Sequence, residues 1–124
     1  MTKKHFQVLV VDDEPIMRAS VQRVLASKGH TVFVAENGAI GVELAKSERP
    51  DLIVMDLNMP VMDGFKATRT IRSAPENIGV KILVLTAETM TVNYEAVYEA
   101  GADAYLSKPI DYENLTKRVT ELLS

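Results

Sequence analysis

Residues that could take part in metal or phosphate chemistry follow four of the short apolar runs in this sequence. In chain order they are Asp12, Asp13, Asp56, Thr86 and Lys108. Apolar runs of this kind are typical of buried strands, and ligands of open α/β sheets bind beyond the carboxyl ends of the strands. If the runs form one parallel sheet, three carboxylates, one hydroxyl and one ammonium group meet at one edge.

The carboxylates of this group predict a bound cation. Three carboxylates at one edge repel one another and raise each other's pKa unless a positive charge offsets them. The group offers only oxygen ligands, with no Cys or His close to it in sequence, and this favours a hard cation. Mg²⁺ is the natural candidate, because it keeps several of its waters and needs few protein ligands.

With a cation reducing the repulsion, Asp56 could attack a phosphoryl donor and form an aspartyl phosphate. Lys108 would then supply a positive charge to one phosphoryl oxygen, and Thr86 a hydroxyl donor to another. Catalysis of this kind depends mostly on positioning and charge neutralisation. The predicted chemistry is therefore transfer of a phosphoryl group to a carboxylate.

Each of these residues also has a simpler interpretation. The acidic residues 12–14 could cap the first helix, where a carboxylate is favourable. Asp56 and the residues 58–64 after it could form a turn that leads into a helix. Thr86 and Lys108 taken singly are ordinary surface residues. Only the joint placement of all of them at strand ends is specific to the chemistry.

The elements that must position these residues alternate along the chain. Strands are predicted at residues 8–11, 31–35, 52–55, 82–85 and 104–106. Helical periodicity, with Asn37 and Asp111 as expected N-caps, predicts helices at residues 15–28, 38–47, 64–73, about 90–100 and 111–123. The pattern is typical of a doubly wound α/β fold, in which a parallel sheet has helices on both faces.

Length and composition bound the possible functions. A chain of 124 residues, 47% apolar and 25% charged, is expected to form one domain over residues 1–124. The net charge of −3 and the scattered lysines and arginines argue against direct binding to nucleic acid or to an anionic membrane. The apolar run after Lys4 is cut short by Asp12, so neither a signal peptide nor a membrane span is expected. The expected location is therefore the cytoplasm, and the lack of cysteine fits such a reducing compartment.

Four motifs carry a resemblance to a known family. They are Val10-Val11-Asp12-Asp13-Glu14, residues 51–60 (DLIVMDLNMP) with Met62-Asp63-Gly64, Leu85-Thr86-Ala87, and residues 100–103 (AGAD) followed by residues 105–109 (YLSKP). With these motifs in this order, the chain resembles the receiver domain of two-component response regulators from Phe6 to Leu123.

The resemblance implies a flavodoxin-like sheet with strand order 2-1-3-4-5. It implies that Asp56 is the phosphoacceptor and that Lys108 contacts the phosphoryl group. It also implies that Mg²⁺ is held by Asp12, Asp13, Asp56 and the backbone carbonyl of Asn58. The Lys108–Pro109 bond is expected to be cis, which proline permits at low cost.

The resemblance further implies a signalling role rather than enzymatic turnover. Thr86 and Tyr105 would form a switch, and the donor would be a histidine kinase or a histidine phosphotransfer protein. A downstream protein would bind the face made by the fourth helix, the fifth strand and the fifth helix. Tyr94 and Tyr98, expected near that face, are interpreted as solvated helix surface. The chain is expected to act as a monomer and to catalyse only its own phosphorylation and dephosphorylation.

Two positions depart from the usual family pattern. Gly41 lies inside a predicted helix, where glycine instead of alanine costs about 1 kcal/mol if the site is exposed. Ile110 follows the Lys108–Pro109 pair where phenylalanine is common. Neither position takes part in the expected chemistry, so both bear on stability and on the output surface.

Two other functions would use some of the same residues. A Mg²⁺-dependent phosphohydrolase of the aspartyl-phosphate type is disfavoured, because the chain has no insertion for a substrate cap and no second Asp two residues after a candidate nucleophile. A phosphorylation-independent interaction module is disfavoured because every chemical position is filled. Steady turnover of phosphate esters would support the first alternative, and partner binding unaffected by phosphorylation the second.

Overall fold

A computed structural model describes residues 5–57, 63–77, 79–86 and 94–124 of the chain. The expected carbonyl ligand Asn58 and the first part of the predicted helix at 90–100 lie outside these residues. The described elements are β1 (Gln7–Val11), α1 (Pro15–Ser27), β2 (Thr31–Ala35), α2 (Gly38–Glu48), β3 (Leu52–Asp56), α3 (Gly64–Ser73), the short 3₁₀ helix η1 (Pro75–Asn77), β4 (Lys81–Thr86), α4 (Tyr94–Glu99), β5 (Ala104–Ser107) and α5 (Tyr112–Leu123).

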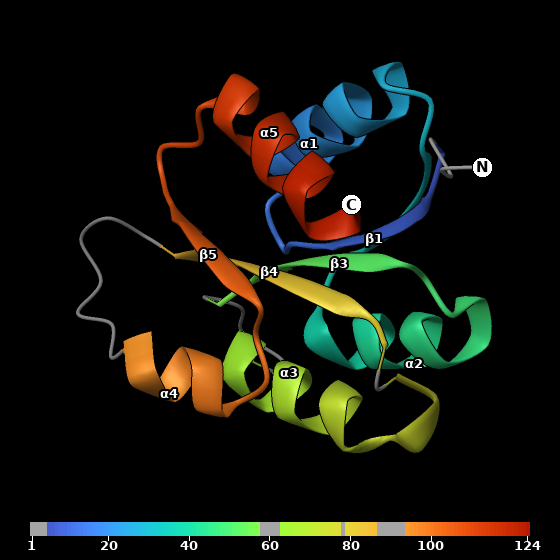
Figure 1. Cartoon of the computed structure of the whole chain (residues 1–124), viewed down its shortest axis with the longest axis vertical. Coiled ribbons are helices and arrows are strands. Elements are labelled where there is room, and N and C mark those ends of the chain that lie inside the picture. The colour runs from blue at the N-terminus through green and yellow to red at the C-terminus, as the bar shows by residue number, and fades with distance from the viewer. Residues whose placement is uncertain (1–4, 58–62, 78, 87–93) are drawn as a thin grey trace.

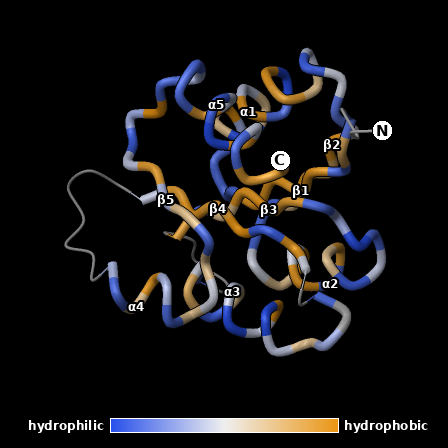
Figure 2. The backbone as a smooth tube through the Cα atoms, viewed as in Figure 1, coloured by the Kyte–Doolittle hydropathy of each residue, from blue (hydrophilic) through white to orange (hydrophobic). Residues whose placement is uncertain are grey.

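The five strands form one parallel sheet in the order β2-β1-β3-β4-β5, which confirms the predicted fold class and strand order. Helices α1 and α5 cover one face of the sheet, and α2, α3 and α4 cover the other (Figure 1). Hydrophobic residues are concentrated along the central strands, and the outward turns of the helices are hydrophilic (Figure 2). The continuous apolar runs are therefore explained by burial of the sheet on both faces.

Each face of the sheet has its own core. On the α1 and α5 face, Val21 and Leu25 pack with Leu115 and Val119 over one set of strand side chains. On the opposite face, Ala67 and Ile71 of α3 and Val97 of α4 pack over the other set. None of the helices in the described part of the chain combines the length and apolar character needed to span a bilayer.

The helix starts follow the capping residues of the sequence. The Asn37 side chain accepts a hydrogen bond from the Ile40 N–H at 2.9 Å, and Asp111 accepts from the N–H groups of Glu113 and Asn114. Both predicted N-caps are thus confirmed. Asp63 caps α3 in the same way, accepting from the Lys66 N–H at 2.8 Å.

Gly41 has a packing role that was not expected. The residue is buried, and a Cβ atom placed on it would lie 2.9 Å from Cγ2 of Val11 and 3.0 Å from Cγ1. The helix-propensity cost estimated for an exposed glycine therefore does not apply. Glycine instead lets α2 approach β1 closely beneath the end of that strand.

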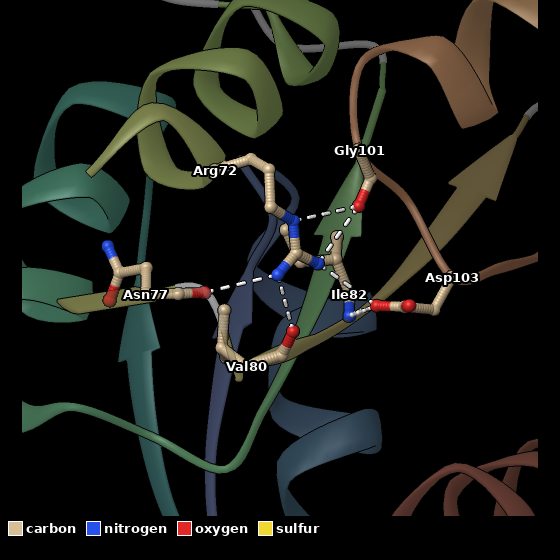
Figure 3. Close-up of polar contacts among 6 residues, drawn as sticks. All are labelled: Arg72, Asn77, Val80, Ile82, Gly101 and Asp103. Carbon is tan, nitrogen blue, oxygen red and sulfur yellow. Dashed lines mark hydrogen bonds and ion pairs between the residues drawn. The ribbon is translucent and has the colours of Figure 1, made fainter. Parts of the chain in front are cut away.

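At the amino ends of β4 and β5, Arg72 of α3 joins several segments (Figure 3). Its Nε and Nη2 donate to the Gly101 carbonyl at 3.1 and 2.9 Å, and Nη1 donates to the carbonyls of Asn77 and Val80 at 3.1 and 2.8 Å. Nη2 also forms a 3.0 Å ion pair with Asp103, whose carboxylate accepts from the Ile82 N–H. All five guanidinium N–H donors thus have acceptors.

Candidate functional site

Three carboxylates meet at the carboxyl edge of the sheet. Asp12 follows β1 and Asp56 ends β3, and these two strands are neighbours with Val11 in register with Met55. Ligand oxygens of Asp12, Asp13 and Asp56 all lie within 4.8 Å of one another. Asp12 and Asp56 are buried, whereas Asp13 is exposed at the rim. The convergence expected from the strand ends is therefore present in the structure.

The two carboxylate oxygens of Asp12 differ in their hydrogen bonding. Its Oδ1 accepts a hydrogen bond from the Glu14 N–H at 2.9 Å. Its Oδ2 is buried and has no hydrogen-bond partner among the described residues. The N-cap of α1 is Glu14, which makes no side-chain capping bond, so simple helix capping does not account for the acidic residues. A buried carboxylate oxygen without a donor is well suited to a cation.

The electrostatics of the cluster also favour a bound cation. Burial, together with the nearby charge of Asp56, raises the pKa of Asp12 from 3.8 to about 6, although the Glu14 N–H and Lys108 act in the opposite direction. A raised pKa means that ionised Asp12 lacks enough positive charge around it. An all-oxygen cluster with this deficit fits a hard divalent cation such as Mg²⁺, and no Cys or His is needed to hold it.

Lys108 approaches the cluster from the end of β5. Its Nζ lies 3.2 Å from Oδ1 of Asp56, in an ion pair whose side chains are 21% and 3% exposed. The Lys108 backbone N–H donates to the Thr86 carbonyl at 2.7 Å, which ties the lysine to the end of β4. The Lys108–Pro109 bond is cis, as the resemblance implied. A lysine in this position can balance negative charge added to Asp56.

Thr86 ends β4 with its hydroxyl buried. The residue is 1% exposed, and Oγ1 has no hydrogen-bond partner among the described residues. An unpartnered buried hydroxyl is costly, and among the described residues Thr68 of α3 carries the other one. Thr86 is next to Leu85, and Asp56 pairs in register with Leu85, so the hydroxyl group belongs to the same edge as the carboxylates.

Gly64 shapes the site in a way that sequence reasoning missed. A Cβ on Gly64 would lie 2.5 Å from the Leu57 Cα and would also overlap the Asp56 carbonyl oxygen. The Gly64 N–H donates to the Leu57 carbonyl at 3.0 Å. Glycine thus lets the start of α3 contact the backbone that carries Asp56. The Asp-Gly pair at the helix start was the available clue, but it was interpreted as a turn and as part of a family motif, without a packing role.

Tyr105 of β5 contacts both tyrosines of α4. Its ring is stacked on that of Tyr94 at a centroid distance of 4.2 Å and meets the edge of Tyr98 at 6.1 Å. Tyr94 and Tyr98 are 41% and 47% exposed. Their interpretation as solvated helix surface therefore holds for exposure but missed the ring contacts. The spacing of four residues, which places both rings on one helix face, was the clue.

The chain is similar in sequence to known proteins over most of its length. The response regulator receiver domain family matches residues 8–120. Protein PilH of Pseudomonas aeruginosa is 36% identical over 118 residues, which cover 95% of this chain and 98% of PilH. Response regulator MprA of Mycobacterium ulcerans is 41% identical over 117 residues, 94% of this chain, and the chain spans 50% of the length of MprA.

Two solved structures are similar throughout. The chemotaxis protein CheY4 of Vibrio cholerae superposes with a TM-score of 0.88 at 34% identity, covering 94% of this chain and 97% of CheY4. The receiver domain of a Pseudomonas aeruginosa sensor histidine kinase, which has a magnesium ion coordinated in its active-site cleft, has a TM-score of 0.88 at 32% identity and coverages of 96% and 98%. The fold, the acidic edge and the family match together show that this chain belongs to the response regulator receiver domains, which are signalling modules.

Proposed function

We propose that the chain accepts a phosphoryl group on Asp56 from a phosphohistidine of a histidine kinase or histidine phosphotransfer protein. The observation that carries this proposal is the environment of Asp56. Its buried carboxylate is paired with Lys108 at 3.2 Å and lies within 4.8 Å of two further carboxylates. Among the three clustered aspartates it alone has a lysine in ion-pair contact within the described residues.

Asp12, Asp13 and Asp56 would hold Mg²⁺, with the backbone carbonyl of Asn58 as a further ligand. Two observations support this assignment. The Oδ2 of Asp12 has no described hydrogen-bond partner, and the pKa of the Asp12 carboxyl is raised. Bound Mg²⁺ supplies charge neutralisation to the carboxylates and to the phosphoryl oxygens. The side chains of Asp12 and Asp13 act only as ligands in this proposal, and Asp56 also acts as the nucleophile.

In the transfer step, a carboxylate oxygen of Asp56 forms a bond to phosphorus while the bond from phosphorus to the histidine nitrogen breaks. The product is an acyl phosphate on Asp56 and a histidine that has regained its ring lone pair. Lys108 is already at the carboxylate and would offset charge on one phosphoryl oxygen. The Thr86 hydroxyl, which has no described partner, would donate to another.

The output of this chemistry is a change of shape. Thr86 turning toward the phosphoryl group and Tyr105 moving inward would bias two pre-existing arrangements of the α4-β5-α5 face, which a downstream protein would bind. The chain would thus act as one receiver domain over residues 1–124, as a monomer in the cytoplasm, and catalyse only its own phosphorylation and dephosphorylation. The signalling role of the family and the net charge of −3 support a protein partner over a nucleic acid.

Intact-protein mass spectrometry after incubation with acetyl phosphate and Mg²⁺ tests the chemistry. We expect one added phosphoryl group in the parent and none in Asp56→Asn, because the amide is a far weaker nucleophile. Asp63→Asn is the matched control, since asparagine can retain the α3 cap and Asp63 lies outside the cluster. Equal phosphate uptake by Asp56→Asn and the parent would show that Asp56 is not the acceptor.

A further inference from the structure

The tyrosines at the α4 and β5 surface form a defined aromatic cluster. The Tyr94 and Tyr105 rings are stacked, with an interplanar angle of 20°, and Tyr98 meets Tyr105 edge-on at 70°. Both arrangements are among those that aromatic pairs prefer, and the closer contact is the one to Tyr94. The rings of Tyr94 and Tyr98 remain partly exposed, so the Tyr105 ring rests on a surface helix.

The register of the sheet relates this ring to the phosphoryl site. Tyr105 pairs with Val84, and Thr86 pairs with Ser107 on the same two strands. Because side chains alternate along a strand, Thr86 and Tyr105 point to the same face of the sheet, the one covered by α3 and α4. Tyr105 packs against the core cluster of that face, which includes Val84 and Val97.

A position of the Tyr105 ring beside Thr86 would therefore compete with its contact to Tyr94. The Thr86 hydroxyl is fully buried at the strand end, whereas the Tyr94 ring is 41% exposed on α4. One ring cannot both stack on exposed Tyr94 and occupy space beside buried Thr86. Any inward movement of Tyr105 must first break the stack with Tyr94 and the edge contact with Tyr98.

We propose that Tyr94, with Tyr98 as the weaker second contact, holds Tyr105 in its outer position and sets how often the unphosphorylated chain adopts the switched arrangement. This inference rests on the proposed function, because the switched arrangement is the one that a group bound at Asp56 favours. A ligand that selects a minor arrangement binds with an apparent affinity proportional to that arrangement's population. Removing the stack raises this population, so it tightens binding at a site that Tyr94 does not belong to.

The test is a titration with beryllofluoride in the presence of Mg²⁺, followed by the NMR amide signal of Lys108. Tyr94→Leu keeps an apolar side chain but removes the stacked ring, and we expect its apparent dissociation constant to fall roughly three- to tenfold. Tyr98→Leu should show a smaller decrease in the same direction. Tyr94→Phe keeps the stack and should bind like the parent.

Glu99→Leu is the matched control, because it introduces leucine at an exposed position of the same helix that is neither three nor four residues from Tyr94 or Tyr98. It should also bind like the parent. If Tyr94→Leu proves unfolded by circular dichroism, Tyr98→Leu decides the question. Parent-like affinity in the leucine variants of both tyrosines, or equal tightening in Glu99→Leu or Tyr94→Phe, would overturn the inference.

The same titration separates this inference from the proposed function. Binding in the parent that Asp56→Asn abolishes supports a site at Asp56, whatever the tyrosine variants do. No binding in the parent would overturn the proposed function and the tyrosine inference with it. Normal binding in the parent with no effect of either leucine substitution at the tyrosines would overturn the tyrosine inference alone.

Discussion

The two ends of the sheet differ in how completely their polar groups are paired. At the amino ends of β4 and β5, all five N–H donors of Arg72 have acceptors, and Asp103 bridges the guanidinium and the Ile82 N–H. At the carboxyl ends, the Oδ2 of Asp12 and the hydroxyl of Thr86 are buried without partners among the described residues. The Arg72 network is thus fully paired, whereas two buried polar atoms at the opposite edge have no described partner.

This contrast indicates that the amino edge stabilises the fold and that the carboxyl edge binds a ligand. An unsatisfied buried polar group costs about 1–3 kcal/mol, so the carboxyl edge weakens the folded state until a ligand supplies the missing partners. The Arg72 network lies at the opposite edge of the sheet from the acidic cluster, and its described acceptors come from η1, from Val80 just before β4 and from the turn between α4 and β5. That network stabilises the fold that carries the carboxyl edge.

The largest effect on stability should follow from removing the Arg72 side chain. Arg72→Ala would leave three carbonyls and the Asp103 carboxylate without this donor, and we expect a loss of about 3–5 kcal/mol in the free energy of unfolding. Urea denaturation measures it.

Arg69→Ala is the matched control, because Arg69 is an exposed arginine on the same helix. Its expected cost is at most about 0.5 kcal/mol. If both arginine variants lost stability equally, the contrast between the two edges would be wrong.

A smaller effect is expected from pH at the carboxyl edge. The folded-state pKa of Asp12 is raised to about 6 from 3.8. Its contribution to the stability of the metal-free chain is therefore favourable at low pH and is lost as pH rises through about 6. Mg²⁺ must displace the bound proton below that pH, so its apparent affinity should be about tenfold weaker at pH 5 than at pH 7.5.

Thermal melting with graded Mg²⁺ at the two pH values measures this change. Asp12→Asn has no proton to displace, so its residual Mg²⁺ effect should depend little on pH between 5 and 7.5. A parent protein whose apparent Mg²⁺ affinity is the same at both pH values would show that Asp12 is not a ligand.

Most of the fold could be predicted because it depends on local patterns. The β-branched run at residues 31–35 and the amphipathic segment at 64–73 became β2 and α3 with the predicted bounds. The helix predicted at about 90–100 is described only over Tyr94–Glu99. The close approach of Gly41 to Val11 could not be predicted, because it depends on how α2 is oriented on the sheet.

The residues of the candidate site could be predicted where they directly follow a predicted strand. Asp12, Asp13, Asp56 and Lys108 each follow an apolar run, and the parallel sheet brings them together. The Arg72 network joins residues up to 31 positions apart, and all its partners except Asp103 are backbone carbonyls that every residue carries, so no sequence pattern predicts it. The stack of Tyr94 on Tyr105 escaped prediction for a similar reason, since it depends on the placement of α4 beside β5.

Thr86 is central to the proposed signalling: its hydroxyl, which has no described hydrogen-bond partner, would bind a phosphoryl group on Asp56 and transmit this binding to the α4-β5-α5 surface. Amide NMR spectra of the parent and of Thr86→Ala, each with and without Mg²⁺ and beryllofluoride, test it most directly. The variant retains Asp56, Lys108 and the carboxylate cluster, so both proteins should show shifts around Asp56. We predict large shifts over Tyr94–Glu99 and β5 in the parent and much weaker ones in the variant. Equal shifts at that face in both proteins would contradict the account.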